Sequence, residues 1–310
     1  MPEYGMGFDV RFDEPPAAVD PTVEIADWSR PLGTGRPTRE AAFFVDGVRR
    51  IDLRLLADVD GTRVPGLFGS YSAGGVLCDR TATFGEHVIA HCLILGGGAK
   101  IPSIDVHFGS GTFRFESFST PGNEPDDPLL RLQDLMRHAE AELAARVAAD
   151  RTTLVVVDGP LAFYSETRGP VVGVIKRFGR VYLEPEHGQL IATLRAGQRT
   201  PLFAIAEPSD RRRRYAWYTR LVDTRSPWHD HAGVVRCEVR GGMRLSEAVA
   251  LADRVSSLLP LFTGRASDPR TPQNLTPIAG LETWLRHRVG DTRLIRRTLL
   301  DHIASMDVAA

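Results

Sequence analysis

Two stretches decide the fold of this chain: AAFFVDGVRRIDLRLL (residues 41–56) and LVVVDGPL (residues 154–161). In both, an Asp-Gly pair follows a run of bulky apolar residues, the composition that is typical of a buried strand. The first stretch then alternates charged and apolar positions, which predicts that the strand continues with one buried face. Each stretch therefore places an acid, Asp46 or Asp158, directly after an apolar run that is expected to be core. The question is whether the two acids form one site.

The composition is that of a globular protein, with 43% hydrophobic and 25% charged residues in a chain of 310. No apolar run approaches the roughly 20 residues that span a bilayer, and the acidic, polar N-terminus does not resemble a targeting segment. Three cysteines without a CxxC motif suit a reducing compartment. We therefore expect a cytoplasmic protein without a membrane partner. The net charge of −1 means that a nucleic acid would need a local basic surface.

The first part of the chain is expected to form a β-meander followed by a helix. Residues 1–40 are rich in Pro, Asp and Gly and predict an N-terminal arm, and residues 41–305 predict one domain. Strand-like segments fill residues 41–119, with a hairpin turn at DVDGTR (58–63). Apolar residues at 3-4 spacing then predict a helix over residues 128–149.

The order of these elements predicts an α/β fold with a mixed sheet and flanking helices. After the buried strand at 154–161 come further strands, a helix over 245–262 and a final helical stretch over 280–304. Three antiparallel strands, a helix, and a strand parallel to the first are the order of a ribonuclease-H-like core, here with additional β elements. In that topology Asp46 and Asp158 lie on neighbouring strands, which are about 4.8 Å apart.

Two carboxylates at such a distance repel each other unless a cation lies between them. Hard oxygen ligands favour Mg²⁺ or Mn²⁺, and two such ions stabilise both the attacking and the leaving oxygen of a phosphodiester. The alternative interpretation is that each Asp-Gly pair is an ordinary turn dipeptide.

Four motifs in order, FFVDGVRR, LVVVDGPL, VVGVIKR and GVVRCEV, resemble those of the NurA nuclease family over about residues 40–290. The resemblance implies a ribonuclease-H-like DNA nuclease, usually a homodimer. It would process single-stranded DNA or DNA ends with two bound ions of Mn²⁺ or Mg²⁺. Its partner would be a hexameric HerA-type ATPase.

The resemblance also implies site residues. Asp46 and Asp158 match the two metal-binding aspartates of the family, which also has a glutamate on the helix between them. Glu140 and Glu142 both fit that place as metal ligands, and the sequence does not choose between them. Glu140 is favoured because Arg137 lies one helical turn before it, as an orienting partner would.

Lys176 resembles the family's lysine after the second acidic strand, where it would contact the scissile phosphate; a surface lysine is the alternative. The chain also departs from the family pattern. Val48 stands where the family commonly has serine, and no histidine occupies the expected C-terminal position. Glu282 and His287 are the candidates to replace that histidine. These departures favour a second hypothesis, a catalytically impaired subunit that binds DNA or docks an ATPase.

One segment suggests contact with a single strand of DNA. RRRRYAWYTR (211–220) combines arginines with aromatic residues, and Arg213, Arg214, Tyr215 and Trp217 could bind phosphates and stack on bases. The alternative interpretation is a solvated loop followed by core aromatic residues. A third functional hypothesis, a related enzyme acting on RNA, differs only in substrate.

Overall fold

The computed structural model describes residues 17–33, 35–161, 163, 169–176, 182–206, 213–223, 228–265 and 273–307. The chain forms two compact units. The first unit comprises Met1–Glu40, Gly159–Ala162 and Val172–Leu275, and the second comprises Ala41–Asp158, Phe163–Val171 and Thr276–Ala310. Both combine strands with helices, and the eleven strands among the described residues include parallel and antiparallel pairs. The predicted α/β class is confirmed at this level, whereas the ribonuclease-H-like topology stays a prediction.

The second unit is built on six strands in the order β7-β2-β3-β4-β6-β5. Its strands are β2 (Ala42–Val59), β3 (Thr62–Cys78), β4 (Ala82–Leu95), β5 (Ile104–Phe108), β6 (Gly111–Ser119) and β7 (Leu154–Asp158). Strands β2, β3 and β4 are antiparallel neighbours, whereas β6 runs parallel to β4 and β7 runs parallel to β2. The predicted strands between residues 41 and 119 are therefore confirmed.

The hairpin between β2 and β3 has a two-residue turn made by Asp60 and Gly61. Both have positive φ angles, 52° and 78°. A type I′ turn needs this conformation at both central residues, and it matches the twist of the strands that it joins. The DVDGTR segment thus forms the predicted hairpin.

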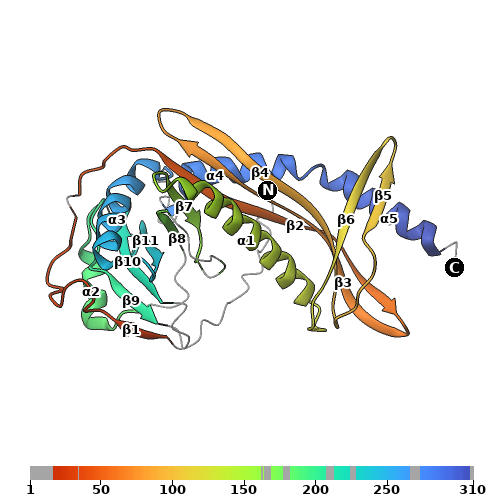
Figure 1. Ribbon diagram of the computed structural model, residues 1–310, viewed down its shortest axis with the longest axis horizontal. Helices are drawn as coiled ribbons and strands as arrows, with labels where there is room; N and C mark the ends of the chain where they lie inside the picture. Colours follow the sequence, from red (N-terminus) through yellow and green to blue (C-terminus); the bar gives the residue numbers. More distant parts are fainter. Residues whose placement is uncertain are drawn as a thin grey trace. The chain divides into compact units, whose positions relative to one another are not determined.

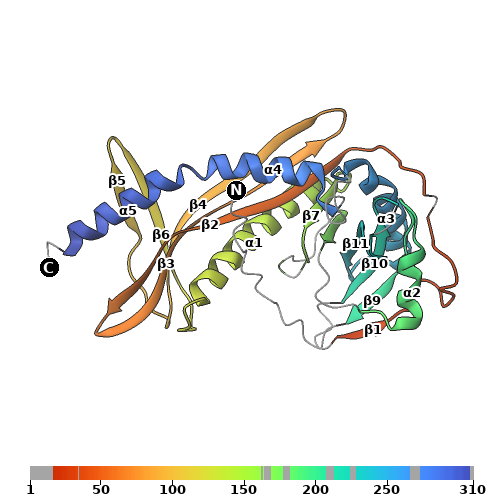
Figure 2. The same ribbon diagram turned by 180° about the vertical axis from the view of Figure 1, so that it is seen from behind.

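Three helices pack on this sheet: α1 (Asp127–Val147), α4 (Thr276–Arg288) and α5 (Thr292–Asp307). Helix α1 covers one face, and α4 and α5 cover the other (Figures 1 and 2). The predicted helix over 128–149 is confirmed as α1. The final helical stretch expected over 280–304 is formed by two helices, α4 and α5, which are separated at Gly290 with its φ of +96°. None of the described helices is both long and apolar enough to cross a membrane.

The first unit is built on five antiparallel strands in the order β1-β9-β10-β11-β8. They are β1 (Ala18–Asp20), β8 (Val171–Ile175), β9 (Phe203–Ala206), β10 (Arg214–Arg220) and β11 (Val234–Arg240). The unit also contains α2 (Pro185–Thr193), α3 (Leu245–Leu258) and the 3₁₀ turn η3 (Leu259–Phe262). The helix predicted over 245–262 is confirmed as α3 and η3.

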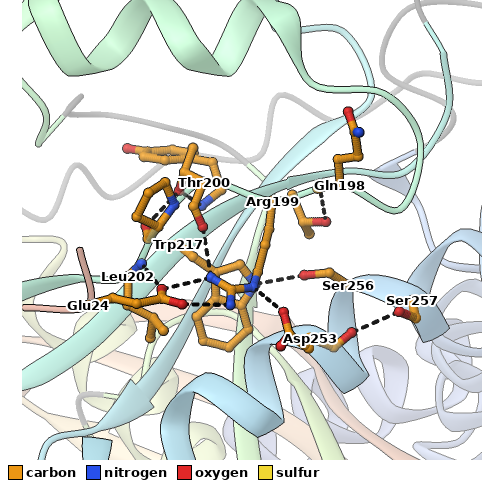
Figure 3. Close-up of polar contacts among 12 residues, drawn as sticks. Glu24, Gln198, Arg199, Thr200, Leu202, Trp217, Asp253, Ser256 and Ser257 are labelled. Carbon is orange, nitrogen blue, oxygen red and sulfur yellow. Dashed lines mark hydrogen bonds and ion pairs between the residues drawn. The ribbon is translucent and has the colours of Figure 1, made fainter. Parts of the chain in front are cut away.

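A buried arginine, Arg199, connects the N-terminal segment to this unit (Figure 3). Its Nη1 and Nη2 donate to the two carboxylate oxygens of Glu24 at 2.8 and 2.9 Å, and its Nε donates to Asp253 of α3 at 2.7 Å. Strand β1 adds backbone pairing with β9. The described part of residues 1–40 is therefore built into the first unit, which differs from the separate arm expected from its composition.

Candidate metal centre

Three acids of the second unit converge, one from each of three elements. Asp46 of β2, Asp158 at the end of β7 and Glu282 of α4 each offer one carboxylate oxygen, and these oxygens all lie within 4.8 Å of one another. Asp46 is 5% exposed, and the other two are half-buried. No other group of three His, Cys, Asp or Glu ligands occurs in the part of the chain that the structure describes. We call these three residues the acid cluster.

Two of the acids meet because their strands are parallel neighbours. The pairing of β2 with β7 runs from Ala42 opposite Leu154 to Val45 opposite Val157. Asp46 and Asp158 occupy the next position on their respective strands, at the same edge of the ladder. The prediction that these two strands are parallel neighbours is confirmed, and it brings the two Asp-Gly motifs together.

The third acid comes from a helix near the end of the chain. Helix α4 buries Ile278, Leu281 and Leu285 against the sheet. At Gly74 of β3 a Cβ atom would lie only 2.9 Å from Cδ2 of Leu285, so the glycine admits close packing of the helix. Glu282 directly follows Leu281 and therefore lies at the flank of the buried stripe. The sequence indicated Glu282 only as one of two replacements for a missing histidine, because nothing local shows which flank faces Asp46.

The helix glutamates predicted as ligands lie elsewhere. Glu140 is fully buried, and its Oε2 accepts a hydrogen bond from Nη1 of Arg137 at 2.8 Å. The same Nη1 donates to the backbone carbonyl of Asp158 at 2.8 Å. Glu142 is exposed on α1. The predicted Arg137–Glu140 pair is confirmed, but the structure groups Glu282, and neither helix glutamate, with the two aspartates.

Gly47 explains the second half of the first Asp-Gly motif. A Cβ atom at this position would collide with Oε1 of Glu140 and lie 2.8 Å from Cγ of Met136. Neighbouring residues of a strand point to opposite faces. Asp46 thus points to the α4 face while Gly47 lets α1 approach the other face. The motif serves both faces of one strand, and neither residue belongs to a turn.

The electrostatics of this region are those of several acids with two nearby arginines, Arg137 and Arg286. Burial raises the pKa of Glu140; the Arg137 guanidinium opposes this rise, and the charge of Asp158 adds to it. Burial lowers the pKa of Arg137, but Glu140, Asp46 and Asp158 outweigh burial and raise the pKa above the ordinary arginine value. Three carboxylates within 4.8 Å repel each other, so a cation among them lowers their energy. A set of carboxylate oxygens is the donor set that suits Mg²⁺, Mn²⁺ or Ca²⁺, so the residues fit such an ion.

Most of the residues predicted to contact DNA are buried in the first unit. Trp217 is 0% exposed, and its Nε1 donates to Oγ of Ser256 at 3.1 Å. Tyr215 is also buried, and Arg214 pairs with the buried Glu238 at 3.1 Å. These three side chains present no free face for a base or phosphate, so the prediction is wrong for them and the alternative, core aromatic residues, is correct. Of the four, only Arg213 is exposed.

The last predicted residue, Lys176, directly follows β8 and is half-buried. Its contact with a scissile phosphate stays a prediction. No protein-family model and no curated protein matches this chain. The NurA family therefore remains a resemblance carried by the four motifs.

Proposed function

We propose that this protein is a divalent-metal-dependent nuclease that hydrolyses phosphodiester bonds in DNA. One observation carries the proposal: three carboxylate oxygens, from Asp46, Asp158 and Glu282, lie within 4.8 Å of one another. The strand order supports it. Three antiparallel strands, then α1, then a strand parallel to the first agree with a ribonuclease-H-like nuclease core, here extended by the β5–β6 hairpin.

The acid cluster would hold Mg²⁺ or Mn²⁺. When bound, such an ion supplies an activated water and neutralises charge on the phosphate under attack. Asp46 is fixed by burial in β2. Arg137 links Glu140 to the backbone of Asp158 and thereby fixes the end of β7 beside β2. The site is thus prepared by residues of strand and helix, which hold a constellation more rigidly than loops do.

The biological setting follows from the resemblance alone. A NurA-type enzyme would act on single-stranded DNA or DNA ends in the cytoplasm, as a homodimer, together with a HerA-type ATPase. Lys176 would neutralise the scissile phosphate in such an enzyme. The chain has no Walker-type GxxxxGK[ST] motif, so the energy for DNA translocation would have to come from the partner.

The test compares Asp46→Asn and Asp158→Asn with the parent protein in Mn²⁺-dependent cleavage of single-stranded DNA. We expect both substitutions to abolish cleavage and to leave the circular dichroism spectrum unchanged. Asp301→Asn is the matched control, because Asp301 is an exposed acid on α5 whose side chain is 73% accessible. Cleavage that survives in both variants would remove the acid cluster from the reaction. RNA and hybrid substrates in the same assay test the related ribonuclease hypothesis.

A second candidate is a catalytically impaired DNA-binding or ATPase-docking subunit. Val48 favours it, because an apolar side chain stands two residues from Asp46 where the family commonly has a hydroxyl. Calorimetric titration with Mn²⁺ separates the two candidates. A nuclease binds the ion at the acid cluster and loses that binding in Asp46→Asn, whereas an impaired subunit shows no such heat.

A further inference from the structure

A pocket of about 500 Å³ lies in the second unit between β2 and the turn that joins α4 to α5. Val48, Arg49 and Arg50 line it from β2, and Arg286, His287 and residues 289–292 line it from the other side. Two arginines, Arg50 and Arg286, face a single acid, Asp291, in this lining, whereas the side chain of Arg49 bonds to Gln133 of α1 on the other face of β2. Asp291 is already occupied, since its Oδ1 accepts the backbone N–H of Leu294 at 2.7 Å and so caps α5. The pocket is therefore suited to an anion.

The pocket and the acid cluster are neighbours on two elements, β2 and α4. Val48 lies two residues after Asp46 on β2, so the two side chains point to the same face about 7 Å apart along the strand. On α4, Nη2 of Arg286 lies 3.2 Å from Oε2 of Glu282, one helical turn away. Arg286 therefore contacts the acid cluster and lines the pocket at the same time.

Arg50 is the fixed cation of the pocket. Its Nε lies 2.7 Å from Oδ1 of Asp52, and its Nη1 donates to the carbonyl of Gly290 and to Oγ1 of Thr292, both at 2.9 Å. The remaining nitrogen, Nη2, is shielded from water and has no hydrogen-bond partner among the residues that the structure describes. The bonds of Nε and Nη1 fix the guanidinium in the wall of the pocket, where its positive charge can attract an anion.

Arg286 is the movable cation. Its side chain is 66% accessible and that of Glu282 is 36% accessible, so their ion pair is a weak one. A divalent ion at the acid cluster would also neutralise Glu282 and leave the guanidinium of Arg286 available for another anion. The long side chain can turn from Glu282 into the pocket without moving α4.

We propose that this pocket binds a phosphate group of the DNA strand, with Arg50 as the fixed cation and Arg286 as the movable hydrogen-bond donor. The proposal deepens the proposed nuclease function and rests on it for the identity of the ligand. The phosphate is either an internal phosphodiester next to the scissile one or the terminal phosphate of a DNA end. Guanidinium groups bind both, because each presents oxygens in a geometry that the planar fork matches.

The test measures the affinity of a phosphorothioate oligothymidylate, which resists cleavage, in the presence of Mn²⁺. We expect Arg286→Gln to weaken binding by about tenfold and to reduce the slope of log K against log salt by about 0.7, the value for one lost phosphate contact on a single strand. Arg286→Lys keeps the charge and should restore the slope. Arg297→Gln is the matched control, since Arg297 is an exposed arginine on α5 with 84% of its side chain accessible.

The ligand source is resolved by using oligothymidylates with hydroxyl ends and with terminal phosphates. A loss of affinity with both identifies an internal phosphodiester, and a loss restricted to the phosphorylated strand identifies a DNA end. Identical affinity and salt dependence of Arg286→Gln and Arg297→Gln would overturn the proposal.

Failure of the pocket and failure of the nuclease site give different results. Removal of the arginine beside Glu282 should leave Mn²⁺ binding intact or make it tighter, whereas Asp46→Asn should lose it. If the salt slope changes in Arg286→Gln while cleavage survives in Asp46→Asn, the nuclease assignment fails and the phosphate pocket stands. If cleavage is lost in Asp46→Asn and the slope does not change in Arg286→Gln, the nuclease assignment stands and the phosphate pocket is rejected.

Discussion

The Arg199 cluster of the first unit and the acid cluster of the second unit both gather charged side chains, but the first joins one cation to two acids, whereas the second joins three acids. The guanidinium of Arg199 is 1% exposed and donates to Glu24, to Asp253 and to the carbonyl of Thr200 (Figure 3). The carboxylate of Glu24 also accepts the backbone N–H of Leu202 at 2.7 Å. Each nitrogen of Arg199 therefore has an acceptor within the chain.

The acid cluster, in contrast, consists of acids alone. Its three members carry the same charge, and the arginines near them are shared with other groups: Arg137 with Glu140, and Arg286 with the adjoining pocket. A structural charge cluster of a folded protein contains its own counter-ions, whereas a cluster for a ligand leaves part of the balance to that ligand. This difference leads us to expect that the two clusters respond in opposite directions when a charge is removed.

The largest effect is expected from breaking the balanced cluster. Arg199→Met leaves Glu24, whose side chain is 9% accessible, without its cation, and should lower the free energy of unfolding by about 3–5 kcal/mol. Urea denaturation measures the loss. Arg195→Met, at an exposed arginine nearby in sequence, should change stability by less than about 0.5 kcal/mol. Equal effects of the two substitutions would show that the Arg199 cluster adds no more to the free energy of unfolding than an exposed arginine does.

The acid cluster should respond in the opposite sense. Asp46→Asn removes one of three repelling charges and should raise the stability of the metal-free protein by about 0.5–2 kcal/mol, as relief of functional strain does. Mn²⁺ at a hundredfold excess over its Kd should stabilise the parent by about 2.7 kcal/mol and leave the variant unchanged. Thermal denaturation with and without Mn²⁺ tests both statements. Destabilisation of metal-free Asp46→Asn would mean that this cluster, too, is structural.

A smaller loss is expected from pushing α1 away from β2. Gly47→Ala places a methyl group against Glu140 and Met136, and overpacking of this kind costs about 1–3 kcal/mol. It should also weaken Mn²⁺ binding, because Arg137 fixes the end of β7 from the same helix. Gly280→Ala on α4 is the control: no atom lies within 4 Å of the added carbon, and alanine favours the helix. A Gly47→Ala protein as stable as the parent would contradict the close packing.

The smallest effect concerns a hydrogen-bonded chain in the second unit, where Asp52 accepts from Ser70 and Nδ1 of His91 lies 2.7 Å from Ser70 Oγ. Burial lowers the pKa of His91, an effect that Asp52 opposes and Arg50 reinforces. The folded state then binds fewer protons than the unfolded state, so stability is full above the unfolded pKa of about 6.5 and decreases as pH falls toward the folded pKa.

His91→Asn should therefore flatten the dependence of stability on pH between about 7 and 5. Urea denaturation at a series of pH values measures it. His107→Asn, at an exposed histidine of β5, should retain the dependence of the parent. A variant of His91 that follows the parent curve would exclude this residue as its source.

Sequence periodicity and turn chemistry predicted much of the second unit. Alternation predicted β2, Asp60-Gly61 predicted the hairpin, and 3-4 spacing predicted α1, because these features depend on local geometry. The position of Asp46 beside Asp158 followed from the order of elements. The break between α4 and α5 also had a signal, since Gly290 and Asp291 are a helix C-cap followed by an N-cap.

Other features depend on packing that no local pattern reports. Glu282 enters the acid cluster because α4 crosses the sheet with one flank toward β2, and its sequence neighbourhood does not show this. Trp217 resembles a stacking residue in composition, but its side chain is buried and donates to Ser256 of α3. Glu140 was indicated correctly as the partner of Arg137, yet the same reasoning did not exclude it as a ligand.

The origin of Glu282 has a consequence for biosynthesis. The members of the acid cluster are separated by 112 residues (158 − 46) and then by 124 (282 − 158). A ribosome that has synthesised β2 and β7 has made two of the three acids, and the last one follows only when α4 is synthesised. A nascent protein therefore contains two members of the acid cluster long before the third, and a protein that is cleaved before α4 lacks Glu282.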